Sequence, residues 1–453
     1  MIAGAPIVSA DAMRAAESAR FASGVTQHEL MARAGAAVAR ETARFAMGQP
    51  VLVLAGPGNN GGDGFAAARL LAAMGLDVTV ATLGDEWRGA AGAMRAGWSG
   101  PIVPLSEAPE RPVIVDGLFG IGLSRPIEGG VAGAIRRLRG AARFVLAIDI
   151  ASGLDADSGA AMGMVLHADA TLALGALKRG HVQGAGIGAS GALLLDPIGI
   201  PIGSDVTMLA RPRIAAPGSD DHKYTRGLVG IHGGAMAGAA RLSAAAAARG
   251  GAGYVVLASD DARVPFDAVV HRDAIDADRA AAALIGPGLG RDAGARAAVR
   301  AWLASDRPLV MDGDALALLS VEALAARPAP TILTPHGGEF ERLFGPVEGD
   351  RIAATLDAAR ITGAVIVHKG AATIIAAPDG RAWMAHPFAW LSTAGTGDVL
   401  AGLAAARLAV VGEPVQAACE AVWLHARAAR LAGPALVADD LPMQLPTAIA
   451  ECL

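Results

Sequence analysis

The chain has 453 residues, 53% of them hydrophobic and 18% charged, so it can form two or three folded domains and is not intrinsically disordered. Its 38 Lys and Arg against 43 Asp and Glu leave a net charge of −5, which gives no electrostatic footprint for non-specific nucleic-acid binding. Two cysteines, Cys419 and Cys452, exclude a disulfide framework and a four-ligand zinc site. No signal peptide and no apolar run of membrane-spanning length is recognisable, so we expect a cytoplasmic protein without a membrane partner.

The first half alternates short apolar runs with helical ones. VLVLA, at Val51–Ala55, is a buried-strand pattern; it leads into GPGNNGGDG and then a helical stretch that Gly75 ends. Further strand candidates are LDVTVATL, PVIVD, FVLAIDI and TLALG. Continuous apolar strands that alternate with helices indicate a parallel sheet covered on both faces. We therefore predict a doubly wound α/β domain over residues 1–210.

The second half, residues 211–453, begins a new α/β alternation after a Pro-rich stretch. Residues 197–223 show no clear helix or long strand, so we predict a linker and the domain boundary there. The segment GLVGIHGG predicts a strand and a glycine turn, and VQAACEAVWLHARAARLAG is predicted as the final helix. Further strand candidates are YVVLAS, AALIG, PLVMD, TILTP, VIVHKG and TIIAA. The halves share no obvious repeat, so we expect two different folds.

Three predicted strand ends in the first half carry side chains with oxygen atoms. Because the carboxyl ends of parallel strands meet at one edge of a sheet, we expect these groups to form one site. Taken singly, each could be a helix cap or an Asx-turn. Oxygen-only groups suit a hard cation or a ribose and an amide. The residues concerned are Asn59, Asn60 and Asp63, then Asp116, then Asp149, Ser152, Asp155 and Asp157.

STAGTGDVLAG is the strongest single motif. Gly395 and Gly397 lie at the start of a predicted helix whose first turn holds Asp398. Amides at a helix N-terminus can bind an anion that forms during a reaction, and a carboxylate beside them can take a proton from a hydroxyl nucleophile. This pairing suits phosphoryl transfer to an alcohol. An ordinary Asp at a helix start is the alternative, which the double glycine disfavours.

NNGGDG, DGLFGIGL, IDIASGLDADSG and GALKRGH resemble the N-terminal domain of the NAD(P)H-hydrate epimerases over roughly residues 10–200, which implies a Rossmann-like fold. The family usually has Pro at the position of Ala151. The resemblance implies potassium ligands at Asn60, Asp116 and Ser152. It implies substrate contacts at Asn59, Asn60, Gly61, Gly62, Asp63, Gly120, Ile121, Gly122, Leu123, Ser124, Arg125, Pro126 and Asp149.

The substrate implied by this resemblance is a nicotinamide dinucleotide hydrated at carbon 6 of its reduced ring. That carbon carries the hydroxyl and bonds to the ring nitrogen, so it can lose and regain water, or the ring can open and close. One acid/base would assist either route. Asp149 is our candidate for this catalytic group, and Asp155 is the second choice.

Motifs of the second half occur in the order found in the ADP-dependent NAD(P)H-hydrate dehydratases, which have a ribokinase-like fold; they include IGPGLG, TPHGGEF, HKGAAT and TAGTGDVLAG. The chain departs from that family at Ala389–Ser392 and in HKYTRG near Lys223. The resemblance implies a catalytic Asp398 and magnesium with ADP. It implies substrate contacts at Gly253, Gly290, His336 and Asp398, and nucleotide contacts at Lys369, Gly370, Ala371, Ala372, Thr373 and Gly397.

Both resemblances together imply a bifunctional enzyme that epimerises hydrated NADH or NADPH and dehydrates the S form at the expense of ADP. The first alternative is a small-alcohol or vitamin-precursor kinase fused to a nucleotide-binding regulatory domain. The second is a first half that only binds a protein or an NAD-derived nucleotide. We expect a homo-oligomer whose partners are NADHX or NADPHX and ADP. The residues leave open the number of subunits, the preference between NADHX and NADPHX, and the choice of ADP over ATP.

Overall fold

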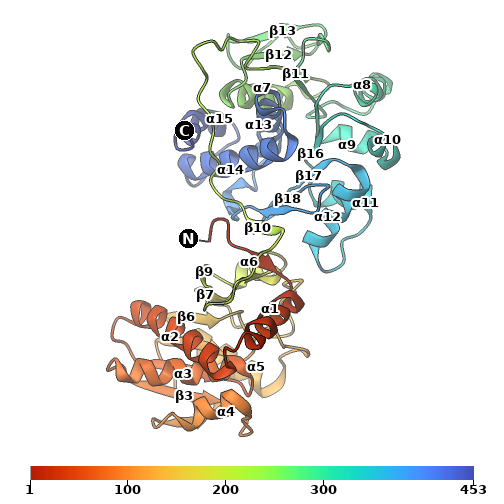
Figure 1. Ribbon diagram of the computed structural model, residues 1–453. Helices are drawn as coiled ribbons and strands as arrows, with labels where there is room; N and C mark the ends of the chain where they lie inside the picture. The colour runs from red at the N-terminus through yellow and green to blue at the C-terminus, as the bar shows by residue number, and fades with distance from the viewer. Residues whose placement is uncertain (1) are drawn as a thin grey trace. The chain divides into compact units, whose positions relative to one another are not determined.

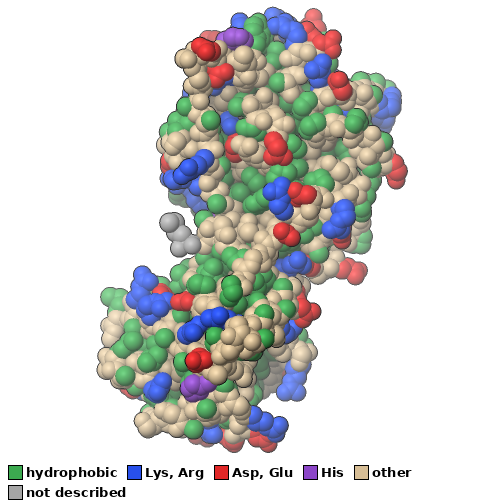
Figure 2. Space-filling model, in the orientation of Figure 1, with side chains coloured by type: hydrophobic (Ala, Val, Ile, Leu, Met, Phe, Trp, Pro, Cys, Tyr) green, Lys and Arg blue, Asp and Glu red, His purple; other side chains and the backbone are tan. Residues whose placement is uncertain are grey.

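A computed structural model describes residues 2–453, which form two compact units, 2–204 and 205–453. The division falls between Ser204 and Asp205, just before the predicted boundary at residue 210. Within the described residues, no helix is both long enough and apolar enough to cross a membrane. Figure 2 shows acidic and basic side chains scattered over the displayed face of each unit.

The first unit (Figure 1) is built on a parallel sheet. The strand order of this sheet is β4-β3-β2-β5-β6-β7-β9. Its central strands are buried along their whole length because helices cover both faces. The doubly wound parallel sheet predicted from the apolar runs is therefore confirmed. The strands are β2 (Val51–Ala55), β3 (Val78–Thr82), β4 (Ile102–Pro104), β5 (Val113–Gly117), β6 (Phe144–Ile148), β7 (Ala170–Leu174) and β9 (Ala192–Asp196).

Two-residue strands β1 (Ile7–Val8) and β8 (Leu177–Lys178) form a separate parallel pair in this unit. The pairing places the N-terminal segment, and the helix α1 that follows it, beside the chain at Lys178. The helices are α1 (Ala10–Ala22), α2 (Gln27–Ala46), α3 (Asn59–Ala73), α4 (Gly89–Ala96), α5 (Gly129–Ala141) and α6 (Gly186–Ala189), with short 3-10 turns at η1 (Leu105–Glu107) and η2 (Arg179–His181).

Helix α3 begins at Asn59, so NNGGDG is its first turn and a half rather than a loop before it. The sequence interpretation placed the helical stretch after Gly64, because glycine is a poor helix former. Tertiary packing explains the difference. A Cβ at Gly61 would lie 1.8 Å from the Gly56 carbonyl oxygen, and one at Gly62 would lie 2.5 Å from the Met31 sulfur. Glycine therefore lets α3 approach its neighbours closely.

The second unit holds a larger sheet with the order β10-β19-β18-β17-β16-β15-β14-β11-β12-β13. All neighbours are parallel except that β18 runs antiparallel to both β17 and β19. The strands are β10 (Val206–Met208), β11 (Leu228–His232), β12 (Tyr254–Ala258), β13 (Val269–Arg272), β14 (Ala282–Ile285), β15 (Leu309–Met311), β16 (Thr331–Leu333), β17 (Val365–His368), β18 (Ile374–Ala376) and β19 (Ala382–Met384).

Helices α7 and α13 pack tightly in this unit: a Cβ at Gly402 of α13 would lie 2.1 Å from the Ser243 carbonyl oxygen of α7. The Ser243 hydroxyl donates to the Asp398 carbonyl oxygen at 2.9 Å, which fixes the start of α13. The helices are α7 (Ala237–Arg249), α8 (Ala293–Ala304), α9 (Asp314–Leu318), α10 (Val321–Ala325), α11 (Gly337–Phe344), α12 (Arg351–Thr362), α13 (Thr396–Val411), α14 (Pro414–Ala432) and α15 (Asp440–Ala450), with a 3-10 turn at η3 (Ala389–Leu391).

Two expectations about the second half are wrong. The stretch predicted as a linker contributes strand β10, which pairs with β19, and a buried Leu209 that joins the core of the second unit. The predicted final helix, α14, is followed by α15, which holds Pro446 inside it. Proline usually marks a helix end, so this segment gave no helical signal. Packing of its buried Leu441 and Leu445 against the core stabilises α15.

Candidate active sites

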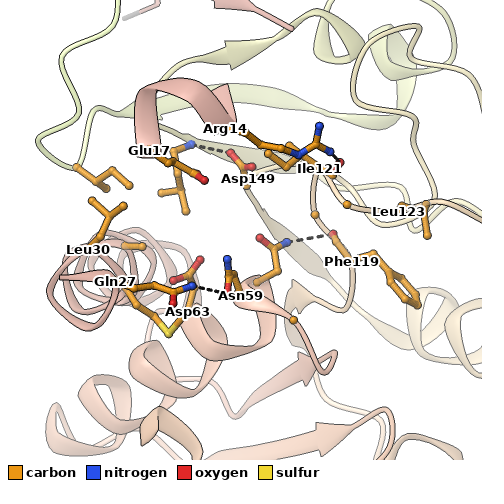
Figure 3. Close-up of a pocket in the computed structure, with 18 of the residues that line it drawn as sticks. Arg14, Glu17, Gln27, Leu30, Asn59, Asp63, Phe119, Ile121, Leu123 and Asp149 are labelled. Atoms are coloured by element: carbon orange, nitrogen blue, oxygen red, sulfur yellow. Dashed lines mark hydrogen bonds between the residues drawn. The ribbon is translucent and has the colours of Figure 1, made fainter. Parts of the chain in front are cut away.

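In the first unit, β2 lies between β3 and β5, so the chain reverses its direction across the sheet at this point. Ligands in such sheets bind outside the carboxyl ends of the strands at the reversal. A cavity of about 420 Å³ lies there (Figure 3). Its walls come from the first turn of α3, the loop after β5, and helix α1 with Arg14 and Glu17.

Most of the predicted substrate-contact residues of this unit line the cavity, and a minority do not. Gly61 and Gly62 pack against the protein instead, as described above. Ser124, Arg125 and Pro126 are exposed in the loop between β5 and α5 and lie outside the lining. The predicted residues that do line it are Asn59, Asn60, Asp63, Gly120, Ile121, Gly122, Leu123 and Asp149.

Two of the predicted cation ligands, Asn60 and Ser152, bind the Phe119 backbone, and the third, Asp116, binds Ser152. Fully buried Asp116 accepts hydrogen bonds from the Ser152 hydroxyl at 2.6 Å and the Ser152 amide at 2.8 Å. The Phe119 amide donates to the Ser152 hydroxyl at 2.9 Å, and the Asn60 amide donates to the Phe119 carbonyl oxygen at 3.0 Å. Burial raises the pKa of Asp116 to about 6, although the Ser152 hydrogen bonds oppose the rise. Buried Ala151 leaves the turn that presents Ser152 intact.

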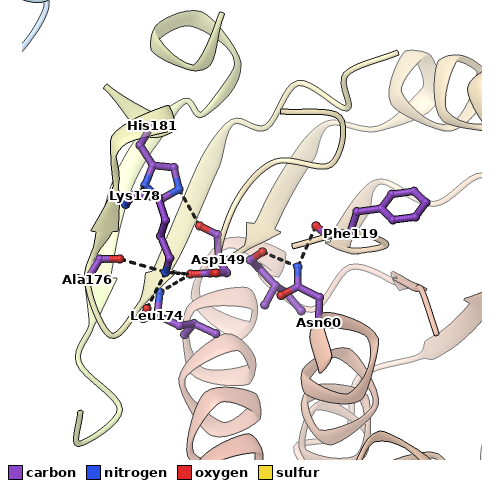
Figure 4. Close-up of polar contacts among 8 residues, drawn as sticks. Asn60, Phe119, Asp149, Leu174, Ala176, Lys178 and His181 are labelled. Atoms are coloured by element: carbon purple, nitrogen blue, oxygen red, sulfur yellow. Dashed lines mark hydrogen bonds and ion pairs between the residues drawn. The ribbon is translucent and has the colours of Figure 1, made fainter. Parts of the chain in front are cut away.

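Asp149 follows β6 and has a left-handed backbone, with φ +64°, which is uncommon for a residue other than glycine. The ammonium of Lys178, itself fully buried, donates to the Asp149 carboxylate and to the carbonyl oxygens of Leu174 and Ala176 (Figure 4). The Leu174 amide donates to the same carboxylate oxygen at 3.0 Å. The left-handed backbone, together with the hydrogen bonds among Asp149, Lys178, Leu174 and Ala176, fixes Asp149 at the cavity wall.

His181 holds the backbone of Asp149. Its Nδ1 accepts from the Lys178 amide at 3.0 Å, so Nε2 carries the proton and donates to the Asp149 carbonyl oxygen at 2.7 Å. Burial lowers the pKa of His181 to about 4, so the ring is neutral at pH 7. The second-choice catalytic group, Asp155, does not line the cavity. It accepts from the Ser158 amide and hydroxyl, both at 2.7 Å, and closes a turn.

Sequence interpretation assigned no role to Arg14, Glu17, Lys178 or His181. Arg14 donates to the Ile121 carbonyl oxygen at 2.9 Å, so it connects α1 to the loop after β5. Burial, and then the charge of Asp149, raise the pKa of Glu17. Lys178 and His181 belong to GALKRGH, one of the motifs on which the family resemblance rests. Arg14 and Glu17 lie in an ordinary helical pattern, and only the fold brings them to the cavity.

In the second unit, the carboxyl ends of β15, β16 and β17 bring three polar side chains together. Buried Asp312 accepts from the Lys369 ammonium at 2.7 Å and from the Thr334 hydroxyl at 2.8 Å. Lys369 reaches the start of α13, because a Cβ at Gly397 would lie 3.3 Å from its nitrogen. Sequence interpretation missed Asp312, since one Asp after a short strand is not distinctive.

Asp398 occupies the first turn of α13, as predicted. Burial raises its pKa to about 6, and the negative charges of Asp312 and Glu339 add to the rise while Lys369 opposes it. The carboxyl therefore changes its charge near neutral pH, within the range where a general base is effective. The amides of Thr396, Gly397 and Asp398 belong to the first helical turn and lack intrahelical partners.

A cavity of about 490 Å³ adjoins this helix start. Lys369, Gly370, Ala371, Thr373 and Gly397 of the predicted nucleotide site line it, whereas buried Ala372 does not. Groups of the kind that bind phosphate thus line a cavity whose remaining wall is mostly apolar, a combination that suits a nucleotide. That wall includes Phe388, Leu391, Leu400 and Val422.

The remaining predicted substrate residues are more dispersed. His336 caps α11 in a capping box with Glu339, and its side chain is 58% exposed at the edge that holds Asp312 and Lys369. Gly290, with φ +84°, follows β14 at the same edge. Gly253 precedes β12, so it lies at the opposite, amino edge of the sheet. A Cβ there would lie 2.3 Å from the Lys223 carbonyl oxygen. The structure does not bring Gly253 to Asp398.

Comparison with known proteins identifies relatives of both units. The family model of NAD(P)H-hydrate dehydratases matches residues 229–450, and the model of the YjeF-related protein N-terminus matches residues 27–180. The bifunctional NAD(P)H-hydrate repair enzyme of Gloeobacter violaceus is 36% identical over 93% of this chain and 92% of its own. The enzyme of that name from Mycobacterium tuberculosis is 35% identical over 88% of each chain.

One solved structure supports the fold of the second unit. A ribokinase-like superfamily protein of Enterococcus faecalis is 27% identical and covers 56% of this chain and 98% of its own, with a TM-score of 0.50. The ribokinase-like fold predicted for the second half is therefore confirmed, as is the Rossmann-like sheet of the first half. Matches that span both units disfavour a kinase with an unrelated regulatory domain.

Proposed function

The chain belongs to the family of the bifunctional NAD(P)H-hydrate repair enzymes, and we propose that its two units divide the two reactions between them. The enzyme converts the R and S forms of hydrated NADH and NADPH into one another and dehydrates the S form to the reduced dinucleotide. Consumption of ADP in the second reaction gives AMP and phosphate. We assign epimerisation to residues 2–204 and dehydration to residues 205–453. This assignment rests on the observation that each unit has its own cavity at the carboxyl edge of its own sheet.

The hydrated nicotinamide ring is proposed to bind in the 420 Å³ cavity, beside Asp149, which acts as acid/base at carbon 6. The free amides at the start of α3 suit the pyrophosphate of the dinucleotide. Arg14 lines the same cavity and can add a positive charge there. We retain as proposed contacts the lining residues between Asn59 and Asp63 and between Gly120 and Leu123. Ser124, Arg125 and Pro126 become contacts only if their exposed loop folds over the substrate.

We propose potassium as the cation held by Asn60, Asp116 and Ser152. The Asp116 carboxylate, the Ser152 hydroxyl and the Phe119 carbonyl oxygen lie together, and the Asn60 side-chain amide, whose nitrogen donates to Phe119, lies beside them. Asn60 would offer its oxygen to the cation by turning its amide over, and this donor set has only one full charge. A bound cation would neutralise buried Asp116 and hold the loops after β2, β5 and β6 together. We expect epimerisation to fall when potassium is replaced by a bulky organic cation; an unchanged rate would remove potassium from the proposal.

Dehydration is proposed to start at Asp398, which takes the proton from the carbon 6 hydroxyl of the S form while that oxygen attacks the terminal phosphorus of ADP. AMP leaves. The ring-nitrogen lone pair then expels the phosphate from carbon 6 and restores the reduced nicotinamide after loss of a ring proton. Lys369 and the amides near Gly397 stabilise the negative charge that develops on the phosphoryl group.

Magnesium is proposed to enter with the nucleotide, as it commonly binds through one or two carboxylates and the substrate phosphates. Asp312 and Asp398 are the carboxylates near Lys369 that could hold it. Bound there, it would neutralise phosphate charge. His336 and Gly290 remain proposed substrate contacts, whereas a role for Gly253 would require substrate at the other edge of the sheet. A cytoplasmic location and a homo-oligomer stay predictions.

The decisive experiment incubates the protein with mixed hydrate epimers, with and without ADP, and follows the recovery of reduced-nicotinamide absorbance. We expect complete recovery with ADP, and interconversion of the epimers without it. In the variant Asp398→Ala, ADP-dependent dehydration should be lost while epimerisation persists, because Asp398 and Asp149 lie in different units. An intact dehydration rate in this variant would exclude Asp398 from the mechanism.

A further inference from the structure

A second carboxyl faces the epimerisation cavity from another element. Asp63 on α3 is only 8% exposed, yet no hydrogen bond to its carboxyl is found within residues 2–453, and it lines the cavity. The neighbouring Gln27 amide donates to Asn59 at 3.0 Å instead. A buried polar group without a partner is costly and calls for an explanation. Figure 3 shows Asp63 on the α2–α3 side of the cavity, across from Asp149 and Glu17.

The charged groups around the two aspartates differ. Burial raises the pKa of Asp63 well above its usual range, and the negative charges of Asp149 and Glu17 raise it further. The carboxylate of Asp149 has the buried ammonium of Lys178 against it. Arg14 and Lys178 are the cations that act on Glu17. A carboxyl that holds its proton more tightly than usual, across a site from a carboxylate paired with an ammonium, fits paired acid/base roles.

We propose that Asp63 is a second catalytic carboxyl, which works from the wall opposite Asp149 so that water leaves carbon 6 on one face and returns on the other. This inference rests on the epimerase function proposed for the first unit. It replaces a single acid/base by two, and it selects loss and return of water over opening of the ring.

The step balances without any reagent other than solvent water. The Asp63 acid gives its proton to the carbon 6 hydroxyl, the carbon–oxygen bond breaks, and water leaves as the ring-nitrogen lone pair forms a double bond to carbon 6. A second water then attacks the planar carbon from the other face, and the Asp149 carboxylate takes its proton. The net result is inversion at carbon 6 and transfer of one proton from Asp63 to Asp149. The reverse reaction, or exchange with solvent, returns that proton.

Oxygen labelling of the unmodified protein tests the route. In ¹⁸O-water without ADP, each inversion should introduce one solvent oxygen at carbon 6, measured by mass spectrometry of the separated epimers and corrected for the enzyme-free rate. Ring opening would keep the original oxygen, and that outcome would overturn the inference while leaving the epimerase function intact. No inversion above the enzyme-free rate would instead refute the epimerase function itself.

Variants test the two carboxyls. Asp63→Asn and Asp149→Asn should each slow inversion by roughly 10²–10⁴-fold, the usual contribution of a general acid/base. Asp149→Asn should still exchange solvent oxygen into one epimer without inverting it, because Asp63 alone can expel and return water on its own face. If Asp149 were the only acid/base, oxygen exchange and inversion would fall together in Asp149→Asn. That result would overturn the proposal.

Two controls separate chemistry from folding. ADP-dependent dehydration of the pure S form by the second unit reports the integrity of each variant chain, and the thermal unfolding of the first unit reports its fold. Glu17→Gln is the matched variant for a carboxyl in the same cavity. If Asp63→Asn inverts the substrate at the unmodified rate, or Glu17→Gln alone shows the loss, Asp63 is not the second carboxyl.

Discussion

Single carboxyl groups illustrate how burial and neighbouring charge set reactivity in this protein. Asp116, Asp63 and Asp398 are all aspartates with raised pKa values, and burial is the largest cause for each. They differ in their partners: Asp116 is hydrogen-bonded by Ser152, Asp63 is affected by the negative charges of Asp149 and Glu17, and Asp398 lies near both Asp312 and Lys369. The same side chain can therefore serve as a cation ligand, an acid or a base.

Asp398 leads to a prediction about pH. Because burial raises its pKa to about 6, the fraction that can accept a proton falls below that pH. We expect the dehydration rate to rise about tenfold per pH unit below about 6 and to level off above it. The measurement is the initial rate with the S form and saturating ADP between pH 5 and 8.

Asp312→Asn separates this titration from that of ADP. It removes a negative charge near Asp398, so the midpoint should move to lower pH, whereas the titration of ADP itself stays unchanged. Asp357→Asn, in an exposed pair with Arg360 on α12, is the matched control and should leave the midpoint in place. A midpoint that ignores Asp312→Asn would assign the profile to the nucleotide.

Among single residues, the polar groups that follow strands could be predicted from the sequence, but the side chains that contact them could not. Asn59, Asn60, Asp116, Asp149 and Ser152 were predicted because each follows a recognisable apolar run and the strand ends share an edge. Their partners could not be predicted by that reasoning. Glu17 and Arg14 come from an early helix of ordinary pattern, and Lys178 depends on the two-residue strand β8, which is too short to have a period.

At the scale of helices and strands, the close packing of α13 on α7 positions the second site. Helix α13, whose first turn holds Asp398, meets α7 at Gly402, where only glycine fits. The Ser243 hydroxyl bond to the Asp398 carbonyl oxygen lies on the same contact. A shift of α13 would therefore move Asp398.

Gly402→Ala should accordingly destabilise the second unit by roughly 1–3 kcal/mol, the usual cost of overpacking. We expect slower dehydration and unchanged epimerisation, measured by thermal unfolding and by the two assays. Gly238→Ala on α7 is the control, because its nearest neighbour would be 4.0 Å away. Its stability should stay the same or rise by up to about 1 kcal/mol. Equal effects from both variants would contradict the packing argument.

Periodicity predicted the long and apolar elements, and it failed where packing overrides local propensity. The central strands of both sheets and helices α7, α13 and α14 follow from continuous apolar runs and glycine stops. The glycine-rich start of α3 and the proline-containing α15 contradict intrinsic helix preference, so only tertiary contacts explain them. Strand β10 has three residues and pairs with β19, far away in sequence. A pairing between such distant residues cannot be predicted from a short stretch of sequence.

At the scale of the whole molecule, each unit has hydrophobic cores of its own, because two clusters of buried apolar side chains belong to residues 2–204 and another lies within residues 205–453. The predicted cut near Pro212 would remove β10 and Leu209 from the second core, whereas a cut between Ser204 and Asp205 keeps both units complete. We therefore expect fragment 2–204 to epimerise without ADP. Fragment 205–453 should dehydrate only the S form and unfold at a higher temperature than fragment 212–453.

Kinetics with mixed epimers test the division. Fragment 205–453 with ADP should show a fast phase followed by a slow one, limited by spontaneous conversion of the R form. Addition of fragment 2–204 should restore a single fast phase. A single fast phase from fragment 205–453 alone would mean that its site accepts both epimers, and the reason for joining the two activities on one chain would be lost.

The pairing of β1 with β8 has a consequence for synthesis on the ribosome. Ile7 pairs with Leu177, so the first strand has no partner until that residue has left the exit tunnel. At about 5–20 residues per second, the wait lasts roughly 10–30 s. Over that time α1, with Arg14 and Glu17, lacks the support of this strand pair, and Lys178 has not yet reached Asp149. The first strand to emerge is therefore among the last to be paired in its unit, and a nascent chain stalled before residue 177 emerges would lack both this pair and the Lys178 contact with Asp149.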